Sequence, residues 1–178
     1  MYIALIVISC LLWAVSLLLL HRRQMLAPAA SYLGLLALSF ADSPDGAPLL
    51  PINNVILIFW LAMTLVVMIA TMLQPYALQA QTRGTSYLTV GAFTGMAVGL
   101  LGYTVTYDES MLYSIMIVAT IVGAFLGFLM FTNTPEGRDV SLRSGRFFKY
   151  LLAKGFPVVI TVMMMGVAAL LAIAVATI

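Results

Sequence analysis

The stretch IALIVISCLLWAVSLLLLHRR at residues 3–23 decides the class of this protein. It begins as an unbroken run of apolar and small residues and ends in His21, Arg22 and Arg23. An uncharged run of this length is what a helix needs to cross the roughly 30 Å hydrocarbon core of a bilayer. Basic residues directly after such a run are typical of the cytoplasmic edge of a membrane. The stretch therefore predicts a retained membrane-spanning helix.

The composition of the whole chain extends this prediction to all 178 residues. Hydrophobic residues make up 63% and charged residues 8%, and the mean hydropathy is +1.13. Soluble domains have roughly 45–50% apolar and about 25% charged residues. We therefore expect a single transmembrane domain over residues 1–178, with no room for a separate soluble domain.

Hydropathy windows of about 19 residues predict an all-α integral membrane protein, a bundle of six transmembrane helices. The predicted spans are residues 3–20, 25–41, 54–73, 87–105, 111–131 and 156–177. The second span is short and contains Pro28 and Gly34. A re-entrant hairpin is therefore the alternative for this segment, and it would leave five full crossings.

The charges favour six crossings over five. With six, all eight Lys and Arg residues share one side, whereas four acidic residues, Asp42, Asp45, Asp108 and Glu109, take the other. A five-span arrangement would mix the two groups. Because Lys and Arg close to a span are retained in the cytoplasm, we predict cytoplasmic basic loops and both termini outside, in a bacterial inner (plasma) membrane.

Small residues recur every fourth position in the last three predicted spans. In lipid, such stripes allow two helix backbones to approach closely, so they predict helix-packing faces, either within one chain or between subunits. The nine predicted packing residues are Gly91, Gly95, Gly99, Ala119, Gly123, Gly127, Ala168, Ala172 and Ala176.

The connection before the last span is basic and aromatic, and it predicts a short interfacial helix near residues 141–154. Its apolar side could lie in the membrane surface while its basic side faces anionic headgroups or a cytoplasmic partner. Gly155 and Pro157 are expected to separate this helix from the last span. The predicted lipid or partner contacts are Arg143, Arg146, Phe147, Phe148, Lys149, Tyr150 and Lys154.

Uncharged polar residues within or beside the spans have two interpretations. Hydroxyl groups can donate to a carbonyl of their own helix and then need no ligand, and asparagine can cap a helix start. The alternative is that they line a path for a solute. The candidate lining residues are Asn53, Asn54, Thr64, Thr94, Thr104, Ser114 and Thr120.

Several function classes lack the side chains that their chemistry needs. No His, Asp or Glu lies within a predicted span, so we expect no enzyme and no catalytic residue. Cys10 is the single cysteine, which excludes an internal disulfide and a cysteine-built metal site in one chain. We expect no metal, no cofactor and no nucleic-acid partner.

Two hypotheses of function remain. The first is a structural or accessory subunit, a possible homo-oligomer or part of a larger membrane complex, which packs through its small-residue stripes and docks lipid or a partner through its basic connection. The second is a small carrier or channel for a neutral or weakly polar solute, because ion-coupled transport normally places ionisable groups within the spans.

Overall fold

The computed structural model describes residues 2–42, 48–75, 84–104 and 109–176, and in these ranges the regular secondary structure is helical apart from one isolated bridge between Asp42 and Pro48. The longer helices are α1 (Tyr2–Arg22), α2 (Ala27–Ser39), α3 (Asn54–Met72), α5 (Thr85–Leu100), α6 (Glu109–Thr132) and α8 (Phe156–Ala176). The short 3₁₀ segments η1 (Gln24–Leu26) and η2 (Leu101–Thr104) adjoin α2 and α5.

Four helical stretches are long and apolar enough to cross a membrane, which confirms the predicted class of helical membrane protein. They are Ile3–Arg22, Asn54–Met72, Met111–Thr132 and Phe147–Val175. The segment Gln24–Ser39 is apolar but shorter. Over the described residues, every predicted span coincides with a helix, and α2 and α5 are the short ones.

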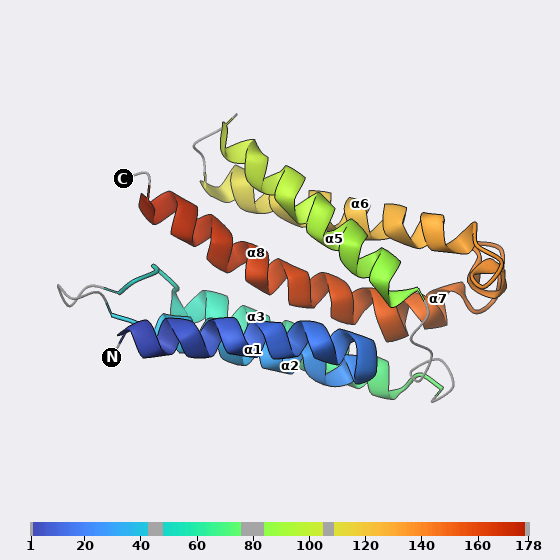
Figure 1. The fold of residues 1–178 in the computed structure, drawn as a ribbon, viewed down its shortest axis with the longest axis horizontal. Coiled ribbons are helices and arrows are strands. Elements are labelled where there is room, and N and C mark those ends of the chain that lie inside the picture. The colour runs from blue at the N-terminus through green and yellow to red at the C-terminus, as the bar shows by residue number, and fades with distance from the viewer. Residues whose placement is uncertain (1, 43–47, 76–83, 105–108, 177–178) are drawn as a thin grey trace.

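Helix α8 lies between two groups of helices, with α1, α2 and α3 on one side and the α5–α6 pair on the other (Figure 1). In the stretch Phe147–Val175, which contains most of α8, 67% of the apolar window is buried inside the protein, compared with 17% for the stretch Ile3–Arg22 in α1. In a bilayer, a helix surrounded by other helices is shielded from lipid, whereas α1 presents much of its surface. Helix α8 is thus the centre of the fold.

Two clusters of buried side chains pack along α8. One contains Trp60, Met116 and Met163, and the other contains Leu20, Phe128 and other residues at the opposite end of α8. Two serine hydroxyl groups of α1 donate hydrogen bonds to α2. Ser9 donates to the Gly34 carbonyl at 2.7 Å, and Ser16 donates to the Ala27 carbonyl at 2.7 Å. These bonds join α1 to α2 through buried polar contacts.

The helix before α8 differs from the predicted interfacial helix at 141–154. Helix α7 begins at Phe147 and ends at Tyr150, and a π-helical turn, Leu151–Gly155, joins it to α8 without a break. In a regular α-helix the ring of Pro157 would clash with the carbonyl four residues earlier. That carbonyl belongs to Ala153, inside the wider π turn, so the chain passes the proline without ending the helix.

Candidate functional site

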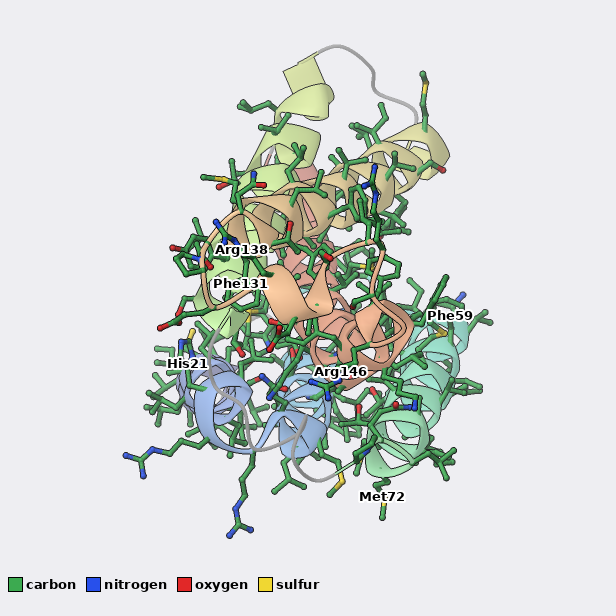
Figure 2. All side chains as sticks on the ribbon, turned by 90° about the vertical axis from the view of Figure 1, so that its right-hand side faces the viewer. His21, Phe59, Met72, Phe131, Arg138 and Arg146 are labelled. Carbon is green, nitrogen blue, oxygen red and sulfur yellow. The ribbon has the colours of Figure 1, made fainter. Side chains whose placement is uncertain are left out.

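The last turn of α1, the start of α5 and α7 lie together at one end of the molecule, opposite the first turn of α1 and the last turn of α8 (Figure 1). We call it the basic end. Figure 2 views the molecule from this side, with His21, Arg138 and Arg146 labelled. Its exposed Lys, Arg and His side chains in the described residues are His21, Arg22, Arg23, Arg138, Arg143, Arg146 and Lys149.

Two polar contacts join α1 and η1 to the first turn of α5. The amide of Gln24 donates to Thr85 Oγ1 at 2.7 Å, and His21 Nε2 lies 3.1 Å from Ser86 Oγ. Both Gln24 and Thr85 are buried, and Gln24 Oε1 has no hydrogen-bond partner among the described residues. Sequence reasoning missed this contact because Gln24 directly follows Arg23 and looked like part of an exposed connection.

A cluster of aromatic rings fixes α7 against α6. Phe128 lies 5.4 Å from Phe147 and 5.8 Å from Tyr150, measured between ring centroids, and Phe131 stacks on Tyr150 at 5.9 Å. Pairs at such distances contribute about 0.5–1.5 kcal/mol each beyond the area that they bury. These ring contacts therefore hold α7, with the basic residues on and beside it, against α6.

The structure divides the predicted contact residues into two sets. Arg143, Arg146, Phe148 and Lys149 are exposed, Phe148 to 72%, and Phe147 is half-buried against Phe128. Tyr150 and Lys154 are buried, with 0% and 1% of their surfaces exposed. Their prediction as surface contacts was wrong, since α7 and the π turn continue the central helix and direct these two side chains into the protein.

Gly84 sets the path of the chain into α5. It is the N-cap of this helix and has φ of 86°, in the left-handed region that favours glycine. A Cβ atom here would meet the Tyr150 hydroxyl and would lie 2.7 Å from Phe131 Cε1. The backbone at Gly84 therefore packs directly against Phe131 and Tyr150 of the same aromatic cluster.

The predicted packing residues of α5 and α6 face each other within one chain. A Cβ on Gly91 would meet the Gly123 carbonyl, one on Gly95 the Ala119 carbonyl, and one on Gly127 the Tyr87 carbonyl. Gly99 is equally close, because its Cβ would lie 2.6 Å from Met116 Cα. On α8, Ala168 is buried and Ala172 is exposed, while the side chain of Ala176 lies outside the described residues.

The candidate solute-lining residues are not brought together. Thr64 and Thr120 are buried and donate to carbonyls of their own helices at 2.7 Å, and Thr94 does so at 2.9 Å on an exposed face. Asn53 accepts from the Val55 amide at 3.1 Å as the N-cap of α3. Asn54 and Ser114 are exposed, and the side chain of Thr104 lies outside the described residues.

Metal-ligating residues do not gather in the part of the chain that the structure describes. That part has no group of three or more His, Cys, Asp or Glu residues placed to hold an ion. Cys10 is exposed on α1. The distinctive arrangement at the basic end is the gathering of exposed cations from the end of α1 and from residues 138–149. Comparisons with family models, with curated proteins and with solved structures found no match to this chain.

Proposed function

We propose that this chain is a six-span structural or accessory subunit of a membrane complex and that its basic end binds a cytoplasmic partner. The observation that carries the proposal is the placement of three exposed cations next to the central helix: Lys149 is on α7, which continues into α8, Arg146 is the N-cap of α7, and Arg143 lies in the turn before it. A solvated loop would pay a larger entropic cost to bind than a pre-ordered set of cations.

Six crossings fit the positions of the chain ends. The first turn of α1 and the last turn of α8 lie at the same end of the molecule, as an even number of crossings requires (Figure 1). The stretch Gln24–Ser39 spans about 24 Å at 1.5 Å per residue, which is short of the roughly 30 Å core. Local thinning of the bilayer and flanking polar residues can accommodate that difference.

The carrier hypothesis receives less support from the same geometry. A solute path needs polar groups that point into a shared space, whereas Thr64 and Thr120 already donate to their own helices. We therefore favour the subunit.

The test compares partner recovery from native membranes between charge variants. In the triple variant Arg143→Glu, Arg146→Glu and Lys149→Glu, we expect at least tenfold less co-purified partner in native mass spectrometry after gentle extraction. The control is Arg22→Glu with Arg23→Glu, which reverses exposed charges at the same end of the molecule, at and directly after the end of α1. We expect this control to retain its partner.

Two results would contradict the proposal. The first is equal recovery from the triple variant and the wild-type protein. The second is equal loss from both charge variants, which would mean that only the overall charge of this end matters.

A further inference from the structure

An apolar groove runs along α8 between α3 and α6. Its cavity volume is about 340 Å³. The floor contains Trp60, Leu88 and Met163, which are at most 4% exposed, while the rim contains Phe59 and Phe125, which are 53% and 38% exposed. The groove is therefore deep at α8 and opens sideways between the two outer helices.

The open side of the groove would face lipid in a membrane. Helices α3 and α6 both belong to the stretches able to span a bilayer, and both contribute exposed apolar side chains to the rim. Figure 2 shows Phe59 on the outer side of α3, away from α1 and α2. An occupant that enters from this side must be apolar along the whole groove.

The dimensions of the groove fit one hydrocarbon chain. On the central helix it extends from Leu151 in the π turn to Met163, which is about 18 Å at 1.5 Å per residue. One leaflet of the hydrocarbon core is about 15 Å thick, half of the roughly 30 Å total. The groove therefore matches an acyl chain of one leaflet, whereas a helix that crosses the membrane needs the full roughly 30 Å.

Charge at one end of the groove selects the headgroup. Leu151 lies at this end of the groove. Two exposed cations precede it in the chain: Lys149 is on α7, and Arg146 is the N-cap of α7. The described carboxylates at the basic end are Glu136 and Asp139, against six exposed Lys and Arg side chains. An anionic headgroup is favoured in such a field by roughly 1 kcal/mol per nearby cation.

We propose that the groove holds one acyl chain of an anionic phospholipid from the leaflet at the basic end, and that Arg146 and Lys149 bind its phosphate. The inference rests on the proposed membrane-spanning arrangement, but it requires no protein partner. The lipid would fill the gap between α3 and α6, so that α8 is covered on this side as well.

The experiment uses Trp60 as a reporter in the groove floor. The chain has two tryptophans, so Trp13→Phe leaves Trp60 as the single tryptophan. The variant is reconstituted into phosphatidylcholine vesicles that contain a small fraction of brominated-chain phosphatidylglycerol, or the same fraction of brominated-chain phosphatidylcholine. We expect at least threefold stronger quenching by the phosphatidylglycerol.

Three further variants locate the site. Ala124→Phe narrows the groove, in which Ala124 is 3% exposed, and we expect it to reduce the quenching to the phosphatidylcholine level. The control Val90→Phe introduces the same side chain on an exposed face of α5 outside the groove and should change nothing. Arg146→Glu with Lys149→Glu leaves the groove intact and should remove the preference for phosphatidylglycerol.

The outcomes separate this inference from the proposed function. Equal quenching of Trp60 by the two brominated lipids in the Trp13→Phe protein would overturn the inference. An unchanged preference for phosphatidylglycerol after Arg146→Glu with Lys149→Glu would overturn it as well. The vesicles contain no other protein, so failure to find a partner in native membranes would leave this result unaffected.

Discussion

Gly84 joins the basic end to α5 in a conformation that a residue with a side chain adopts only at a cost. Its φ of 86° and the nearness of Tyr150 and Phe131 are two separate reasons for glycine at this position. Gly145, in the same basic region, has neither constraint, because a Cβ there would meet nothing within 4 Å. The two glycines look alike in the sequence and differ only in their surroundings.

We predict that Gly84→Ala destabilises the protein by at least about 1–2 kcal/mol, the usual cost of a left-handed residue with a Cβ. Contact of the new methyl group with the aromatic cluster adds to this cost. The measurement is thermal unfolding in detergent, with Gly145→Ala as the control that should match the wild-type midpoint. Equal midpoints for the two variants would contradict the assigned role of Gly84.

Helices α5 and α6 approach each other through backbone atoms rather than through side chains. The carbonyls of Ala119, Gly123 and Tyr87 occupy the space that a Cβ on the opposite helix would need. In lipid, where water exclusion does not hold helices together, such close van der Waals contact is a main source of helix association. A backbone cannot move aside as a flexible side chain can.

Gly95→Ala is therefore expected to destabilise the protein, although helix propensity alone predicts that alanine is more stable than glycine at this position. Alanine is favoured over glycine in a helix by about 1 kcal/mol, but here its methyl group would meet the Ala119 carbonyl and lie 2.8 Å from the Ala119 carbonyl carbon. Overpacking against fixed atoms typically costs about 1–3 kcal/mol, so we predict a net loss of stability.

The matched control for this prediction is Gly102→Ala. A Cβ at Gly102 would lie 3.3 Å from Ile115 Cγ2, and its three nearest neighbours are all side-chain atoms, which can shift by a few tenths of an ångström more easily than backbone. We expect it to unfold at or above the wild-type temperature in the same detergent assay. A Gly95→Ala protein as stable as this control would show that the α5–α6 contact is looser than described.

Across the whole molecule, α8 has the position of a core helix, and the other helices shield it from lipid except along the groove between α3 and α6. This arrangement places the first turn of α1 and the last turn of α8 at one end (Figure 1), and the exposed cations of the described residues lie at the other. Moving Lys or Arg across a membrane is disfavoured, so the basic end is expected to be cytoplasmic.

Single cysteines test this topology in a Cys10→Ser background, because Cys10 is the one native cysteine. Gly145→Cys lies at the basic end, where a side chain has space, and Asn54→Cys lies exposed at the start of α3. We predict that a membrane-impermeant maleimide labels Asn54→Cys on intact cells and labels Gly145→Cys only after permeabilisation. Labelling of both on intact cells would contradict the six-span arrangement.

The sequence was sufficient for properties that depend on one helix at a time. Helix α3 lies at Asn54–Met72 and was predicted at 54–73, since an uncharged apolar run must satisfy its backbone internally in lipid. The Asn53 cap was anticipated for the same local reason. The separate surface helix at 141–154 was not found, because its start depends on the packing of Phe147 and Tyr150 against α6.

The sequence by itself determined the membrane class and the positions of the apolar helices, because both follow from hydropathy along the chain. It also separated the charges that support the proposed orientation. Only the tertiary structure decided that α8 is central, that Tyr150 and Lys154 are buried, and that α3 and α6 leave an apolar groove between them. These features arise from contacts between residues far apart in the chain, which periodicity within one helix does not record.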